Sequence, residues 1–544
     1  MLRFRAGWML ARRWLLAVFV LLALLCIAIP PVPAGPVEAA PLEQVEREPP
    51  LEPDFDIITG RFYTQAAMQP EGRGPYAVGF SVTNEGGIPL WDEYRRLGGP
   101  GVLGYPISRR FFLDGTVMQA FQKAVLMWDA GAHRAVAAPI LDMLHSIDAD
   151  AWLEASKGIP AFVPVPDEGG KPWEELARLR YNAYLDLFPP FQQRYFALFD
   201  PVNLLGLPAA PPKDMGPAVV LRFQRGALQQ WKQNMPWARA GEITMASVGE
   251  IARESGLLPK EAFEPEDSPL LTGEAARKPW SGWWWPSNPA VPGPKLYDPN
   301  GPLDRYDRFV TYTGAPNPRT REWELANNRF TGAKLNWAGH CNGWAAAAVL
   351  EPEPVQPRTI AGIVFGVAEQ KGLLSAYHFA DGAQWIYGSD SEKVNPADFH
   401  RQLLRWIGQE RKAFVVSFRD QGDEIWSYPA YKFRLVMGPD PLVPGRWHVR
   451  ATVWFAAGDV PPGFVGTKPW PGPEGKLFEY FITGDPRNPI DGAWEGNSVY
   501  GFYGHPRYIW YPDPSFRNEP RVLTSPGLTM HFLRFILGRE NEDA

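Results

Sequence analysis

The stretch Trp337-Ala338-Gly339-His340-Cys341-Asn342-Gly343-Trp344-Ala345-Ala346-Ala347-Ala348-Val349-Leu350 predicts a loop that runs into a helix, which Glu351-Pro352-Glu353-Pro354 then ends. Cys341 falls at the start of this helix, where unpaired backbone N–H groups and the helix dipole favour a thiolate. We therefore expect its pKa to lie below the roughly 8.5 of a free cysteine. The small residues that follow would let the helix pack closely on a sheet and hold the sulfur in place.

The two cysteines of the chain lie in very different surroundings. Cys26 sits inside an apolar N-terminal segment, so the exported part keeps one thiol, Cys341, with no partner for an internal disulfide. Composition leaves two interpretations of that thiol open, a small buried hydrophobe and a reactive group exposed to oxidation.

Export is predicted by the first residues. Four arginines within residues 3–13 precede an uncharged run from Trp14 to Ile29, and small residues follow. Residues 1–40 are predicted to be a signal peptide cut after Ala39, with an uncleaved membrane anchor as the alternative, and residues 41–55 a linker. The protein is expected to be secreted or associated with the cell envelope.

Composition excludes some classes of partner. The 544 residues are 45% apolar and 13% aromatic and carry a net charge of −6. Such a chain can bury several cores, and it offers no basic surface for a phosphate backbone. Nucleic acid is therefore not an expected partner.

Residues 56–259 contain an internal repeat. Leu103-Gly104-Tyr105-Pro106 is followed eighteen residues later by Phe121-Gln122-Lys123, and Leu205-Gly206-Leu207-Pro208 by Phe223-Gln224-Arg225 at the same spacing. Each copy predicts a short helix followed by a half-buried strand, the helices over Leu90 to Leu97 and Phe191 to Phe199 and the strands ending at Trp128 and Trp231. The pair resembles the LGFP repeat of cell-wall-associated proteins, which implies a binding module, with cell-wall polymer as a partner; a plain structural domain is the alternative.

Residues 260–302 are rich in Pro, Gly and Trp and predict a second linker. Trp283-Trp284-Trp285 lies within it. Three adjacent tryptophans cannot share one face of an element, so at least one must cover a neighbouring surface. They could form an aromatic platform for sugar or peptide, or fasten two domains together.

Residues 303–544 hold six of the eight histidines, and histidine is the side chain best suited to move protons near neutral pH. The strand pattern from Trp447 to Phe455 puts His448 on its polar face, and His448 is the first candidate for the base that serves Cys341. Asp485 is the candidate to orient that imidazole, with Glu495 as the alternative, and His505 is a rival base.

Four residues near the thiol are expected to line the cleft or to stabilise an oxyanion: Trp337, His340, Asn342 and Trp344. No zinc spacing and no EF-hand loop is present, so no metal or cofactor is predicted; calcium stays open without a motif to support it.

Four stretches in order resemble the transglutaminase elicitor family of oomycete wall glycoproteins, which also has bacterial members: Gly339 to Ala345, Pro396-Ala397-Asp398-Phe399-His400, Glu424 to Tyr431, and Gly492 to Trp510. The resemblance implies a papain/transglutaminase-like α+β domain after the repeat module. It also implies that Cys341 attacks a glutamine carboxamide of a protein or peptide, and that an amine or water resolves the thioester. The sequence departs from the family at Arg507, where an Asp is expected, and at Ser427-Tyr428, which replace Asn-Gln.

Two other classes of function remain open. A cysteine peptidase or amidase of the cell envelope would use the same thiol on other amides. A non-catalytic envelope-binding protein would leave Cys341 as an ordinary thiol.

Overall fold

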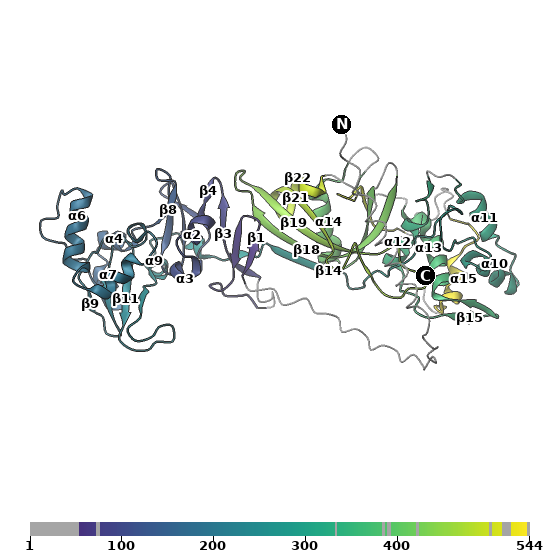
Figure 1. Cartoon of the computed structure of the whole chain (residues 1–544). Helices are drawn as coiled ribbons and strands as arrows, with labels where there is room; N and C mark the ends of the chain where they lie inside the picture. Colours follow the sequence, from purple (N-terminus) through teal and green to yellow (C-terminus); the bar gives the residue numbers. More distant parts are fainter. Residues whose placement is uncertain are drawn as a thin grey trace, which may run out of the picture. The chain divides into compact units, whose positions relative to one another are not determined.

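The computed structural model describes residues 54–71, 77–331, 335–382, 387–388, 393–419, 424–499, 503–513 and 524–540, which form an α+β fold (Figure 1). The predicted export segment and its cleavage position lie outside these residues. Among the described helices, none has both the length and the apolar character needed to cross a bilayer.

The first half of the described chain is built from short strands and helices. Its strands are β1 (Phe55–Ile57), β2 (Gly60–Tyr63), β3 (Val78–Glu85), β4 (Ile88–Pro89), β5 (Phe111–Leu113), β6 (Thr116–Ala120), β7 (Val125–Asp129), β8 (Arg134–Ala137), β9 (Lys213–Asp214), β10 (Ala218–Arg222), β11 (Ala227–Trp231) and β12 (Ile243–Met245). Its helices are α2 (Leu90–Arg96), α3 (Gly99–Leu103), α4 (Ile140–Ser146), α5 (Asp150–Trp152), α6 (Trp173–Arg180), α7 (Pro189–Phe196), α8 (Pro201–Leu204) and α9 (Val248–Ser255).

The two repeat copies form matching contacts, as the repeated motifs predicted. Each copy makes a four-stranded antiparallel sheet, in the orders β5-β6-β7-β8 and β12-β11-β10-β9. In each, a helix tyrosine stacks on the phenylalanine of the Phe-Gln motif and donates to the glycine carbonyl of the Leu-Gly motif: Tyr94 with Phe121 and Gly104, Tyr195 with Phe223 and Gly206. Both glycines have positive φ, which explains why glycine occurs in both motifs.

The second half is organised around one large antiparallel sheet. Its strands are β13 (Glu266–Asp267), β14 (Leu270–Glu274), β15 (Arg358–Ile360), β16 (Ile363–Phe365), β17 (Phe414–Arg419), β18 (Ile425–Pro439), β19 (Arg446–Ala456), β20 (Pro469–Trp470), β21 (Lys476–Asp485), β22 (Asn488–Trp494) and β23 (Tyr508–Trp510). Its helices are α10 (Pro302–Tyr312), α11 (Thr320–Asn327), α12 (Cys341–Leu350), α13 (Val367–Tyr377), α14 (Pro396–Gln402) and α15 (Met530–Leu537). The main sheet has the order β22-β21-β19-β18-β17-β23, with β14 and β20 added at its sides.

Strand β19 confirms the predicted alternation. Val449, Ala451, Val453 and Phe455 are buried in the core of the sheet, whereas His448 and Arg450 reach the other face. Period-two burial of this kind fixes the register of β19 between β18 and β21.

The segment 260–302 is not a free linker, contrary to the prediction. Strand β13 pairs with β3, and β14 pairs with β18 of the main sheet. Trp285 is buried in a core, while Trp284 packs edge-on against Trp426 at a centroid distance of 5.0 Å. The strands could not be predicted here because they are short, lie among prolines and glycines, and form only by pairing with strands far away in the chain.

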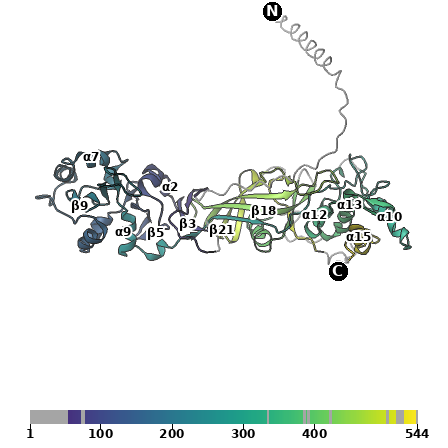
Figure 2. The same ribbon diagram turned by 90° about the horizontal axis from the view of Figure 1, so that it is seen from below.

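Helix α12 begins and ends where the sequence predicted. It packs on the sheet through β18 and β17 and on its other side against α13, and Figures 1 and 2 show it at one end of the long strand β18. Ala345 to Ala348 are all buried, because small side chains let the helix approach both neighbours. This packing fixes the position of Cys341.

Candidate functional site

Cys341 is the first residue of α12 and faces the beginning of β18. Its side chain is a free thiol with a relative exposure of 8%, and its Sγ lies 3.8 Å from the carbonyl oxygen of Ile425, to which it donates. Burial raises the pKa of the Cys341 thiol, although donors from the backbone and hydroxyl of Ser427 and the backbone of Asn342 act in the opposite direction. The predicted lowering of its pKa is therefore wrong, because desolvation outweighs the helix terminus.

A chain of buried hydroxyls leads to the thiol. Ser417 and Ser427 face each other across β17 and β18 with their Oγ atoms 2.9 Å apart, and Trp510 Nε1 donates to Ser417 Oγ at 3.0 Å. An indole nitrogen only donates, so Ser417 accepts from Trp510, and Ser417 can still donate its own hydrogen to Ser427 or accept one from it. Ser427 can then turn its hydrogen toward the sulfur when the sulfur is charged.

Replacing Ser427 by alanine should raise the pKa of Cys341 further, because the thiolate would lose a hydrogen bond, and a hydrogen bond to a charged group is worth ~1.5–3 kcal/mol. The pH dependence of iodoacetamide alkylation measures this midpoint. Ser375→Ala, which removes a buried hydroxyl bound to the Lys371 carbonyl oxygen instead, is the matched control and should leave the midpoint in place. An unchanged midpoint in Ser427→Ala would show that the hydroxyl does not act on the sulfur.

His448 is not placed beside Cys341. It pairs with Gly438 near the far end of β18, whereas the thiol contacts Ile425, the first residue of that strand, which is roughly 43 Å away along the strand at ~3.3 Å per residue. Its Nε2 lies 2.7 Å from Asp440 Oδ2, and its Nδ1 lies 2.8 Å from Glu495 Oε2. The predicted Cys341–His448 pair is therefore not formed, because the polar face of a long strand carries no information about which end meets the helix.

The two predicted acidic partners behave differently. Asp485 is exposed at the β21–β22 hairpin, where its Oδ1 accepts from the backbone N–H of Arg487, and it does not orient His448. Glu495, the alternative, does bond to His448. The pair of His448 and Glu495 thus forms, but away from the thiol.

His340 is buried and turns away from Cys341. Its Nε2 lies 3.2 Å from Glu324 Oε1, and its ring packs on Phe379 at a centroid distance of 4.1 Å. Burial lowers the pKa of His340. The ring is therefore held by Glu324 of α11 and by Phe379, which follows α13.

His505 lies in the loop before β23. Its Nδ1 is 3.0 Å from the Ser498 carbonyl oxygen, so Nδ1 carries the hydrogen and Nε2 keeps a lone pair. Burial lowers the pKa of His505, and nearby lysine and arginine charges lower it further. The strand that follows pairs Tyr508 with Ser417, so this loop leads to the hydroxyl chain beside the thiol.

The remaining predicted site residues have structural contacts. The Asn342 side chain donates to the carbonyl oxygen of Phe379 at 3.0 Å, so only its backbone N–H is left to serve the sulfur. Trp344 is buried in the core of the main sheet rather than in a cleft. Trp337 lies half-buried in the turn before the helix.

Sequence reasoning missed two features of this region. Tyr428 follows Ser427, stacks on Trp470 at 4.2 Å, and interacts electrostatically with Cys341. His378 forms a buried pair with Asp381 at 2.6 Å, near the opposite end of α12. The departure from the family at Ser427-Tyr428 was a signal that could have indicated Tyr428. No motif pointed to the pair of His378 and Asp381.

Within the described residues, no group of three or more His, Cys, Asp or Glu side chains is arranged to hold a metal ion.

Comparison with known proteins adds a limited similarity. No family model and no curated protein matches the chain. Among solved structures, the chain is similar to the GP42 transglutaminase from Phytophthora sojae, with 18% identity and a TM-score of 0.36 over 49% of this chain and 91% of that one. A function for this protein must therefore rest on the geometry around Cys341.

Proposed function

We propose that this protein is an exported, cysteine-dependent acyltransferase of the protein-glutamine γ-glutamyltransferase type. The observation that carries the proposal is the set of donors around the Cys341 sulfur: the N–H groups of Asn342 and Ser427 and the Ser427 hydroxyl. They meet at the start of a helix that is fixed between a sheet and α13. Donors held rigidly where negative charge develops stabilise a thiolate and the oxyanion that follows.

The chemistry starts from a neutral thiol. As the S–C bond to the glutamine carboxamide forms, the thiol proton leaves for a base, and the base returns a proton to the departing ammonia. The enzyme thioester is then attacked by an amine, which gives an isopeptide bond, or by water, which gives deamidation. A resting neutral thiol protects the exported cysteine from oxidation, which proceeds through the thiolate.

We assign the base to His505 rather than His448. Its Nε2 lone pair is free of the Ser498 contact, and its lowered pKa keeps the ring neutral and able to accept a proton. Tyr508, three residues after His505, pairs with Ser417, which faces Ser427, while the His505 ring itself stacks on Trp494 with the centroids 5.9 Å apart. The glutamine substrate itself is inferred from the family resemblance, and an envelope peptidase or amidase is the competing assignment.

The test compares two histidine variants in one assay, the incorporation of a fluorescent primary amine into a glutamine-bearing protein. His505→Ala should lower kcat by about 100-fold or more, the usual contribution of a general base. His448→Ala is the matched control: it should keep kcat and lower only thermal stability, since Asp440 and Glu495 lose their partner. The reverse pattern, in folded variants, would overturn the assignment, and cleavage of backbone amides without amine incorporation would favour the peptidase.

A further inference from the structure

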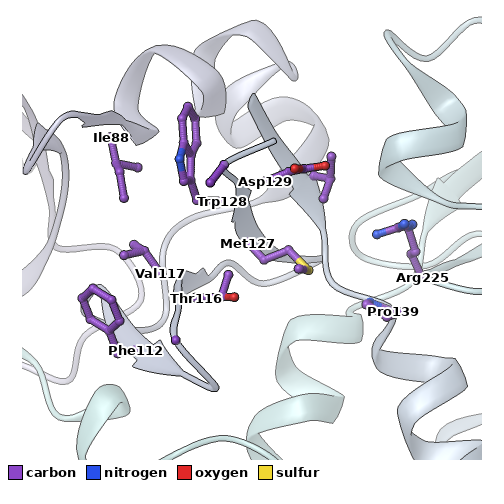
Figure 3. A pocket seen from close by; sticks show the side chains of 12 residues that line it. Ile88, Phe112, Thr116, Val117, Met127, Trp128, Asp129, Pro139 and Arg225 are labelled. Carbon is purple, nitrogen blue, oxygen red and sulfur yellow. The ribbon is translucent and has the colours of Figure 1, made fainter. Parts of the chain in front are cut away.

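A cleft in the first repeat copy has no part in the acyl-transfer site. It has a cavity volume of about 660 Å³ and lies against the sheet β5-β6-β7-β8 (Figure 3). Phe112 pairs with Val117 across β5 and β6, and continuing the register places Trp128 of β7 in the same row. The cleft is therefore lined by residues of neighbouring strands, including Phe112 of the edge strand β5 and Thr116 at the start of β6.

The second repeat copy shows which residues the fold needs. Aligned on Phe121 and Phe223, both copies keep a fully buried leucine, Leu126 and Leu228. The cleft residues differ: Met127 and Trp128 of the first copy correspond to Gln229 and Gln230 of the second. The second copy forms the same sheet with glutamines at these positions, so the strand pairing does not require the tryptophan, which packs at the margin of the core of the first half.

The lining combines apolar and polar groups. Figure 3 shows Ile88, Val117 and Phe112 on one side, Asp129 and Arg225 on the other, and Met127 and Trp128 between them. Phe112 is 70% exposed. Asp129 is oriented by the N–H groups of Gly131 and Ala132, and Arg225 donates to the Ala137 carbonyl oxygen.

The charges in this cleft argue against a strongly charged ligand. One carboxylate and one guanidinium lie within it; burial lowers the pKa of Arg225, and the charges of Asp142, outside the cleft, and of Asp129 act in the opposite direction. A site of this composition suits a neutral molecule with one apolar face and a hydroxylated rim.

We propose that this cleft binds a neutral carbohydrate chain, with the C–H face of one sugar ring against Trp128 and ring hydroxyls bonded to Asp129 and Arg225. The site lies outside the acyl-transfer region and does not depend on that assignment. Its tryptophan is the residue that distinguishes the binding copy from the structural one.

Trp128→Gln tests the proposal, because it installs the residue that the second copy already carries at this position. The full chain would be titrated by calorimetry with five neutral hexasaccharides: cellohexaose, laminarihexaose, chitohexaose, mannohexaose and maltohexaose. At least one should bind, and Trp128→Gln should weaken it tenfold or more while keeping the thermal midpoint. Trp237→Ala removes a 64% exposed tryptophan outside the cleft and should bind as the wild type does.

Several outcomes would overturn the proposal. The first is that none of the five sugars binds. The second is that Trp128→Gln binds sugar as tightly as the wild type does. The third is that an unglycosylated peptide, and no sugar, binds in a way that depends on Trp128. Cys341→Ala should bind sugar as the wild type does, so that failure of the acyltransferase assignment leaves this test intact.

Discussion

Cys341→Ala should abolish amine incorporation, with a loss of at least about 1,000-fold, because the other cysteine of the chain, Cys26, lies in the predicted export segment. The substitution removes one small buried atom at the start of α12, so the fold should persist. The assay is the transfer of a fluorescent amine to a glutamine-bearing protein, read together with a thermal melt. Cys341→Ser provides a closer isostere and should be equally inactive, since a hydroxyl is far less nucleophilic.

The outcome separates the classes of function that the sequence left open. Equal incorporation by wild type and Cys341→Ala would end the enzymatic assignment and leave an exported binding protein. Loss of incorporation together with loss of the folded state would not count as evidence of catalysis, which is why the melt accompanies the assay. A stable, inactive variant would confirm that the sulfur performs the chemistry.

Gly343→Ala should destabilise the C-terminal half by about 3 kcal/mol or more, at the upper end of the cost of overpacking. A Cβ at Gly343 would lie 2.2 Å from the Ser375 carbonyl oxygen and 3.1 Å from Phe379 Cα. Both are backbone atoms and cannot turn aside as a side chain can. The helix would have to move away from α13, and Cys341, two residues earlier, would move with it.

Chemical denaturation followed by tryptophan fluorescence measures this loss. Gly463→Ala is the matched control, since nothing lies within 4 Å of its would-be Cβ, and it should change stability by less than about 0.5 kcal/mol. A Gly343→Ala protein as stable as the wild type would show that α12 and α13 can separate freely. The donor set around the thiol would then not be rigidly held.

Several elements could be predicted because their signal is local. The start and end of α12 follow from a loop, a run of alanines and the Glu-Pro pairs. The buried face of β19 follows from strict alternation, and the two repeat copies follow from equal spacing of short motifs. Each of these depends on residues close together in the chain.

The site partners could not be predicted in this way. Ser417 and Ser427 lie on consecutive strands, and Trp510 joins them because β23, about ninety residues later, pairs with β17. His448 is a histidine on the polar face of β19, as the sequence predicted. It pairs with Gly438 near the C-terminal end of the 15-residue strand β18, whereas the thiol lies at the other end of that strand. Chain order says which residues share a strand, but not which end of that strand meets a helix.

An α+β chain with a duplicated first half and one cysteine at a helix start follows from the amino-acid pattern alone. The burial of this thiol, the approach of Ser427 to it and the pairing of His448 with Asp440 and Glu495 follow from the folded arrangement. Periodicity and helix-start signals act over a few residues. Desolvation and hydrogen bonding depend instead on every group that folding brings to the same place, whatever its distance along the chain.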